Sequence, residues 1–128
     1  MNILLDTHII LWALTDDARL PRGARDLITD EGNRVFASVA SMWEIAIKYL
    51  LKPERIPVSG EEFLHYCERS GYESLPIRER HVLALESLPA LHADPFDRML
   101  VSQAIAESLV FITHDATLGG YGEAVRVV

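Results

Sequence analysis

The sequence predicts an α/β fold, a three-layer α/β/α sandwich around a mainly parallel central sheet of four to five strands. The first observation is that short apolar or β-branched runs alternate with longer segments of helical periodicity. Strands that alternate with helices pair in parallel through right-handed crossovers, and the helices cover both faces of the sheet. The second observation is that residues 3–5 and 109–112 are apolar at every position, which is typical of central strands buried on both faces. We therefore expect these two strands to be neighbours.

The predicted elements follow one another in a regular order along the chain. Strands are expected at residues 2–5, 34–37, 72–75, 109–113 and 124–128. Helices are expected at residues 8–14, 21–30, 38–51, 60–69, 77–88 and 95–108. No internal repeat, low-complexity segment or linker rich in Pro, Gly and Ser divides them, so we expect residues 1–128 to form a single domain.

Local chemistry marks several helix ends. Pro21 suits the first position of a helix, and Asp94 followed by Pro95 is typical of an N-cap with proline at the next position. Pro53 disfavours helical backbone at the residue before it, and Gly71 accepts the left-handed conformation that commonly ends a helix. We expect the preceding helices to end at these two positions.

Composition places the chain among ordinary globular domains, with 49% apolar and 24% charged residues. A chain of 128 residues buries enough surface to fold without disulfides, and Cys67 is the only cysteine. Asp6 interrupts the N-terminal apolar run and no basic segment precedes it, so neither a signal peptide nor a membrane span is predicted. We expect a cytoplasmic protein with no membrane partner.

The charge balance is acidic, with 12 basic and 19 acidic side chains and a formal net charge of −7. This balance argues against the broad basic surface that gives non-specific nucleic-acid binding. It does not exclude a nuclease, because carboxylates that hold divalent cations add to the negative count.

Four acidic residues are candidates for one site. Asp6 directly follows the first apolar strand and Asp115 shortly follows residues 109–112, so both belong to the carboxyl edge where open α/β sheets bind ligands. Glu44 and Asp97 each fall within about one turn of an expected helix start. Four converging carboxylates repel one another, and a hard divalent cation compensates them. Removing one charge, as in Asp115→Asn, should then leave the metal-free protein at least as stable as the parent.

Each acid also has a purely structural interpretation. Asp6 suits a turn, and Asp115 suits the cap of a short helix. Glu44 lies three residues after Ser41, as in a capping box, and Asp97 suits the first turn of a helix through the helix dipole. Asp94 is better explained as an N-cap than as a ligand.

Four segments, taken together and in order, resemble those of PIN-domain proteins, and most closely the VapC-type toxins of bacterial toxin–antitoxin modules. The segments are LLDTH at 4–8, SVASMWEIAIK at 38–48, HADPFDR at 92–98 and THD at 113–115. They span essentially the whole chain, and the ordered set is far more specific than any single acid. The resemblance implies a PIN-like fold.

The resemblance also implies a site and an activity. Asp6, Glu44, Asp97 and Asp115 match the acidic quartet that holds Mg²⁺ or Mn²⁺ and cleaves RNA; the second-tier positions are Asp94, Thr113 and Ser41. The implied protein is a metal-dependent endoribonuclease, the toxin of a type II module, with an RNA substrate and a cognate antitoxin. A homodimer is expected as well, since residues 8–14 and the helix that carries Trp43 and Leu50 offer more apolar surface than one sheet needs.

Other residues suggest a role near this site. Arg98 follows Asp97 and can contact phosphate, although a solvated or salt-bridged helix residue explains it better. The five histidines lack the spacing of a zinc enzyme. His8 and His114 lie near the acids, where loop hydrogen bonding is the simpler interpretation. Cys67 lies on an amphipathic helix and is interpreted as a small apolar residue.

Two rival functions use similar chemistry. A receiver-like signalling domain is also a short α/β protein with aspartates and Mg²⁺, but it expects an acidic pair after the first strand and a late lysine. Here Asp6 is unpaired and the only lysines are Lys48 and Lys52. A catalytically silent PIN-fold binding module is the second rival, and the intact quartet argues against it.

Overall fold

The computed structural model describes residues 1–128 and contains one five-stranded sheet in which every strand pair is parallel. The strands are β1 (Asn2–Leu5), β2 (Arg34–Ser38), β3 (Glu73–Leu75), β4 (Val110–Thr113) and β5 (Val125–Val127). Their order in the sheet is β3-β2-β1-β4-β5. The chain therefore builds outward from β1 to β3, then reverses and adds β4 on the other side of β1. The predicted pairing of the two apolar strands is confirmed.

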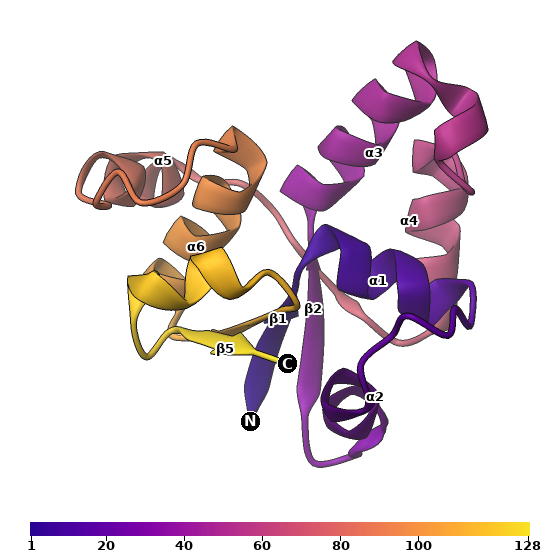
Figure 1. Cartoon of the computed structure of the whole chain (residues 1–128), viewed down its shortest axis with the longest axis horizontal. Helices are drawn as coiled ribbons and strands as arrows, with labels where there is room; N and C mark the ends of the chain where they lie inside the picture. The colour runs from indigo at the N-terminus through magenta and orange to yellow at the C-terminus, as the bar shows by residue number, and fades with distance from the viewer.

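Six α-helices and two short 3-10 helices connect the strands (Figure 1). They are α1 (Thr7–Leu14), α2 (Arg22–Thr29), α3 (Val39–Leu51), η1 (Pro53–Arg55), α4 (Gly60–Arg69), α5 (Glu79–Glu86), α6 (Pro95–Glu107) and η2 (Ala116–Tyr121). In Figure 1, α5 and α6 lie on one side of the strands, whereas α1, α2 and α4 lie on the other. The three-layer α/β/α sandwich predicted from the sequence is confirmed. None of the helices has the length and apolar character needed to cross a lipid bilayer.

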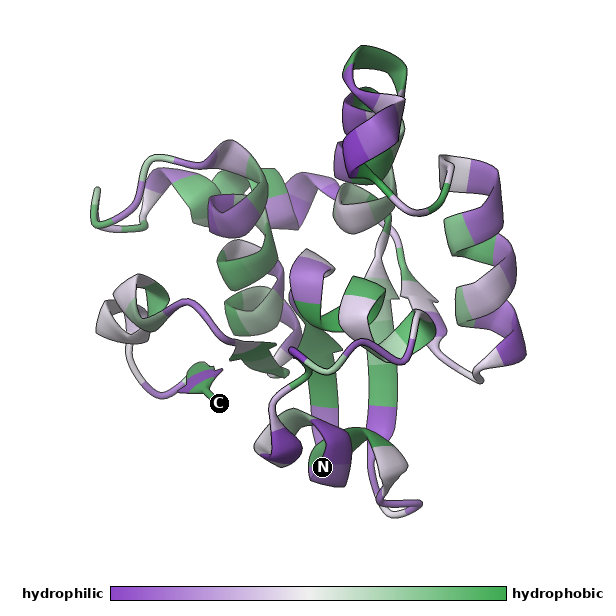
Figure 2. Cartoon of the chain, turned by 45° about the vertical axis from the view of Figure 1, so that its right-hand side comes forward, coloured by the Kyte–Doolittle hydropathy of each residue, from purple (hydrophilic) through white to green (hydrophobic).

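The hydrophobic core has two clusters, one on each face of the sheet, because side chains along a strand point alternately to the two faces. Ile3 and Leu5 of β1 pack in one cluster with the helices on the α1 side, and Leu4 between them packs in the other with Leu100 of α6. Successive side chains of a strand point to opposite faces of the sheet, so a run that is apolar throughout serves both clusters. Figure 2 shows these strands in green, enclosed by helices that turn purple positions outward.

Helix ends agree with local chemistry in most places. Asp94 caps α6 by accepting hydrogen bonds from two backbone N–H groups of its first turn. Gly71 follows α4 with a φ of +79°, which glycine adopts without strain. Pro21 was predicted at the first helical position, but it is the N-cap residue, and α2 begins at Arg22.

The start of α3 differs from the expected capping box and from the expected position of Glu44 near the helix start. The helix begins at Val39, and the Ser38 side chain caps it by accepting a hydrogen bond from the Ala40 N–H. The expected capping box of Ser41 and Glu44 is therefore wrong, and Glu44 lies in the second turn rather than the first. The reason is that β2 runs directly into α3, so the helix takes its cap from the last residue of the strand.

The divided core predicts the effect of truncating α6. Leu100→Ala should lower the free energy of unfolding by about 2–5 kcal/mol, because Leu100 is fully buried and its loss leaves a cavity. Denaturant unfolding followed by circular dichroism measures this change. The control Leu50→Ala, at a position 82% exposed, should change the free energy by less than about 0.5 kcal/mol. Equal losses in the two variants would contradict this account of the core.

Candidate metal centre

The switch in strand order places Asp6 in a crevice at the carboxyl edge of the sheet. Asp6 follows β1, and its backbone N–H donates to the Ile112 carbonyl of β4 at 2.9 Å. The chain leaves β1 toward β2 on one side and β4 lies on the other. Such switch points are where open α/β sheets bind ligands.

The Asp6 carboxylate is buried and accepts hydrogen bonds from two neighbouring groups. Its Oδ1 accepts from the Thr7 N–H at 2.7 Å, which caps α1, and its Oδ2 accepts from the Thr113 hydroxyl at 2.7 Å. Burial raises the pKa of Asp6, and these hydrogen bonds oppose the rise. Thr113 also accepts the Asp115 N–H at 3.0 Å, so one hydroxyl joins two of the predicted acids.

Glu44 is the most unusual acid of the set. It is only 4% exposed, and its Oε2 accepts from the Lys48 ammonium at 2.7 Å. Its Oε1 is buried and has no hydrogen-bond partner at all. An unsatisfied buried acceptor costs about 1–3 kcal/mol, which a bound cation would offset. Beside it, buried Ser41 accepts a hydrogen bond from the Thr7 hydroxyl at 2.9 Å, which ties α1 to α3.

The pKa of Asp97 indicates that the acids are close together. Burial and, after it, the negative charges of Asp6, Asp94 and Glu44 together raise the pKa of Asp97 to about 7, against a hydrogen bond from His92 that lowers it. Charges influence one another in this way only at short range. Asp6 at the end of β1, Glu44 on α3 and Asp97 in the first turn of α6 therefore lie near one another.

Asp115 lies at the open side of the pocket, with a side chain 41% exposed. It caps η2, where Oδ1 accepts from the Thr117 N–H at 3.0 Å and the Thr117 hydroxyl at 2.6 Å. The hydrogen bond from Thr117 lowers the pKa of Asp115. The lowered pKa means that the fold stabilises the negative charge of Asp115, whereas the raised pKa of Asp97 means that the fold destabilises its charge. We therefore no longer expect Asp115→Asn to relieve repulsion.

His92 belongs to the pocket and was not singled out from the sequence. Its Nε2 lies 2.9 Å from Asp97 Oδ2 and 4.0 Å from Asp115 Oδ2, and its Nδ1 lies 3.2 Å from the Thr117 hydroxyl. Single ligand atoms of His92, Asp97 and Asp115 lie within 4.8 Å of one another. The signal available in the sequence was its place in the HADPFDR segment.

Two second-tier residues have structural roles. Asp94 Oδ1 accepts the Phe96 and Asp97 N–H groups at 2.8 and 3.1 Å, so its N-cap interpretation is confirmed, and its charge acts on Asp97. Arg98 donates to the Pro89 carbonyl at 2.9 Å and to the Tyr121 hydroxyl at 3.1 Å. Its guanidinium is therefore engaged in joining two loops, and neither the salt bridge nor the phosphate contact considered for Arg98 is needed to explain it.

A hollow opens beside Asp6 and Asp115. It has a volume of about 270 Å³, and its other lining residues are His8, Trp12 and His114. Trp12 lines this hollow, and its ring contacts both histidines, with ring centroids 6.0 and 5.8 Å apart. The acids thus have an open approach from solvent.

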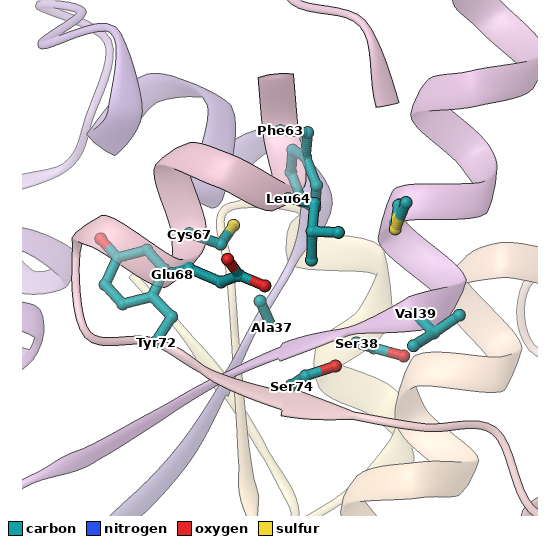
Figure 3. A pocket seen from close by; sticks show the side chains of 10 residues that line it. Ala37, Ser38, Val39, Phe63, Leu64, Cys67, Glu68, Tyr72 and Ser74 are labelled. Carbon is teal, nitrogen blue, oxygen red and sulfur yellow. The ribbon is translucent and has the colours of Figure 1, made fainter. Parts of the chain in front are cut away.

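A second hollow, between α4 and strands β2 and β3, has no acid cluster (Figure 3). It holds about 30 Å³, and most of its lining is apolar. Cys67 faces it, and burial raises the pKa of the thiol to about 12. Because a protonated thiol is a poor nucleophile, the interpretation of Cys67 as an apolar core residue is supported.

The donor set fits a divalent cation. Asp6, Glu44, Asp97 and Asp115 supply only carboxylate oxygens, which Mg²⁺ and Mn²⁺ prefer. The orphaned Oε1 of Glu44 and the raised pKa of Asp97 both indicate negative charge that the protein alone does not balance. Of these acids, Asp97 and Asp115 have ligand atoms close enough together to hold one ion, and His92 joins them.

Fold and pocket define an α/β protein with an acidic site at the switch point of a parallel sheet. Comparison with known families gives the class a name: the PIN domain family matches residues 3–123. The match covers nearly the whole chain, and the chain belongs to this family. Among curated proteins, none matches.

Solved structures share the fold. VapBC2 from Rickettsia felis, bound to a DNA fragment from its promoter, matches with a TM-score of 0.69 at 17% identity, over 100% of this chain and 98% of that one. A toxin–antitoxin complex from Klebsiella pneumoniae matches with a TM-score of 0.69 at 14% identity, over 98% and 96%. A domain of a functionally unknown protein from Methanocaldococcus jannaschii DSM 2661 gives 0.56 at 16% identity, over 99% and 90%.

The opposite pKa shifts of Asp97 and Asp115 predict opposite effects on stability without metal. The pKa of the Asp97 carboxyl is 3.8 in the unfolded chain and about 7 in the folded protein. Its ionisation therefore lowers the free energy of unfolding increasingly between these two pH values, and the loss is complete above the folded pKa. In the presence of a chelator, Asp97→Asn should raise the melting temperature at pH 8 and raise it less at pH 5. Asp115→Asn should lower the melting temperature or leave it unchanged at pH 8. Thermal melts at the two pH values test this, and a stabilised Asp115→Asn with an unaltered Asp97→Asn would contradict it.

Proposed function

We propose that this protein is a metal-dependent endoribonuclease that acts as a VapC-type toxin of a type II toxin–antitoxin module. The observation that carries the proposal is the buried carboxylate oxygen of Glu44, which has no partner and lies in a pocket with Asp6 and Asp97. A fold alone does not determine which reaction a protein catalyses. An acidic pocket at the edge of the parallel sheet of a PIN domain nevertheless supports a nuclease. RNA as the substrate and the cytoplasm as the location are part of the proposal.

The residues would divide the work of phosphodiester hydrolysis. When bound, Mg²⁺ or Mn²⁺ would supply polarisation of the phosphoryl group and a water of lowered pKa. Asp6 and Glu44, held by Thr113 and Lys48, would anchor the cation from the buried side. Asp97 and Asp115 would bind it nearer to solvent, and the hollow of about 270 Å³ beside Asp115 would be the side from which RNA approaches.

The rival functions are separated by topology and by assay. Receiver domains have the strand order 2-1-3-4-5, whereas this sheet has the order β3-β2-β1-β4-β5, so the receiver-like alternative is wrong. A catalytically silent PIN-fold module has the same topology as an active one. Only a cleavage assay distinguishes these two.

Cleavage should depend on the cation and on each acid. We expect labelled RNA to be cut with Mn²⁺ or Mg²⁺ and left intact with excess chelator. Asp6→Asn, Asp97→Asn and Asp115→Asn should each reduce cleavage by about a hundredfold or more, because asparagine keeps the shape and removes the charge that binds metal. Asp26→Asn, at an exposed helix position outside the pocket, should cleave as the parent does.

Undiminished cleavage in chelator would refute metal dependence. Cleavage by none of the proteins under any metal condition, with metal binding intact, would favour the silent module. Asp94→Asn should be milder than Asp97→Asn, because asparagine serves nearly as well as aspartate at an N-cap.

A protein partner is supported by the projecting end of α3, which is green at the top of Figure 2. Leu50 and Leu51 are 82% and 75% exposed, and such apolar surface marks interaction sites. The expected contribution of residues 8–14 is smaller, because Ile9 and Ile10 are buried in the protein's own core. We propose an antitoxin that covers this end and a homodimer that uses the remaining apolar surface.

Toxin function predicts growth arrest. Expression of the chain alone should stop growth, and co-expression of a small protein encoded beside it should relieve the arrest by covering the acidic pocket with a basic side chain. Asp97→Asn should be harmless and Asp26→Asn as toxic as the parent. Normal growth with soluble parent protein present would contradict the toxin assignment.

Light scattering tests the proposed homodimer. A mass of 14.4 kDa at micromolar concentration would contradict it.

A further inference from the structure

The ring of His92 lies between the two acids on the open side of the pocket. Nε2 is 2.9 Å from Asp97 Oδ2 and 4.0 Å from Asp115 Oδ2. His92 belongs to the α5–α6 loop, Asp97 to α6 and Asp115 to the cap of η2, so two other segments of the chain meet at this ring nitrogen. The ring is mostly buried, with 19% of its side-chain surface exposed.

Hydrogen bonding determines which ring nitrogen of His92 is available to a cation. The Thr117 hydroxyl has a single proton, and it donates that proton to Asp115 Oδ1 at 2.6 Å. Toward His92 the same oxygen can only accept, so Nδ1–H at 3.2 Å is the donor. Nε2 is then the nitrogen left for the acids: in the metal-free pocket it shares a proton with Asp97 Oδ2 at 2.9 Å, and a cation that displaces this proton would bind the Nε2 lone pair.

This is the arrangement of a metal-binding histidine. Histidine ligands usually donate their other ring N–H to a neighbouring acceptor, which sets the tautomer and the ring orientation. Thr117 supplies that acceptor here. The buried, unpartnered Oε1 of Glu44, whose charge acts on Asp97, is independent evidence that a cation completes this pocket.

We propose that His92 Nε2 is a nitrogen ligand of the cation, together with Asp97 and Asp115, and that it makes the pocket prefer transition metals such as Mn²⁺ and Co²⁺ over Mg²⁺. The inference rests on the proposed metal centre and not on the identity of the substrate. An imidazole nitrogen favours first-row transition metals, whereas Mg²⁺ favours oxygen ligands. The preference therefore follows from one ring nitrogen among carboxylates.

Metal binding to the intact protein tests the assignment without any cleavage assay. In His92→Gln, calorimetry should show Co²⁺ affinity reduced by about tenfold or more and Mg²⁺ affinity nearly unchanged, because an amide oxygen replaces the nitrogen. His114→Gln is the matched control: His114 lines the hollow beside Asp115, but its Nδ1 lies 2.6 Å from the Val128 carbonyl oxygen. The His114→Gln variant should bind Co²⁺ and Mg²⁺ as the parent does.

Pulsed electron paramagnetic resonance gives a direct readout. The Mn²⁺ signal of the parent and of His114→Gln should show coupling to an imidazole ¹⁴N nucleus, and that of His92→Gln should not. Thr117→Val should weaken Co²⁺ binding by about tenfold and Thr117→Ser should restore it, since serine keeps the hydroxyl that orients the ring.

Three results would overturn the proposal. They are a parent without ¹⁴N coupling, a His92→Gln variant that loses Co²⁺ and Mg²⁺ affinity equally, and a variant that loses neither. Equal losses would mean that His92 only positions Asp97. A parent that shows ¹⁴N coupling yet cuts no RNA would refute the proposed function and support this inference.

Discussion

Burial of like charges at one sheet edge is the constraint on which the rest of the structure depends. Asp6 and Glu44 are almost fully buried, and each raises the pKa of Asp97. Their repulsion would separate the elements that carry them unless other contacts held those elements together. Hydroxyl groups provide these contacts: Thr113 of β4 binds Asp6, and Thr7 of α1 binds α3. Strands packed on both faces supply the rigid base, so the charges stay in place.

The pocket has two chemically different sides. On the buried side, Asp6 and Glu44 present oxygens whose charge the protein balances only in part, through Lys48 and two hydrogen bonds. On the open side, Asp115 is satisfied by its helix cap, and its pKa falls instead of rising. Asp97 belongs to both, since burial raises its pKa while His92 lowers it. A cation bound here would contact ligands with different needs for charge, the greatest need being at Glu44.

How much of this follows from sequence depends on the distance over which each feature is determined. Strand positions and the meeting of Asp6 with Asp115 were predictable, because apolar runs and strand ends are local patterns. Glu44 was a candidate because it was expected near a helix start, but it lies in the second turn of α3, so the family resemblance is the better ground for proposing it. His92 was missed because its ring meets the acids only after the α5–α6 loop packs against η2, which depends on tertiary structure alone. Pro21 missed its helical position by one residue, within the ordinary uncertainty of helix ends.

Helix α3 connects the pocket to the projecting surface. Its first half is held by the Ser38 cap and by buried Ser41, which fixes Glu44 at the sheet edge. One turn further on, Lys48 neutralises one oxygen of Glu44 and still has 44% of its side chain exposed. The last turn carries Leu50 and its apolar neighbours, which no element of the protein covers. Because a single rigid helix carries all these features, the geometry of the buried acid and that of the exposed surface cannot be varied independently.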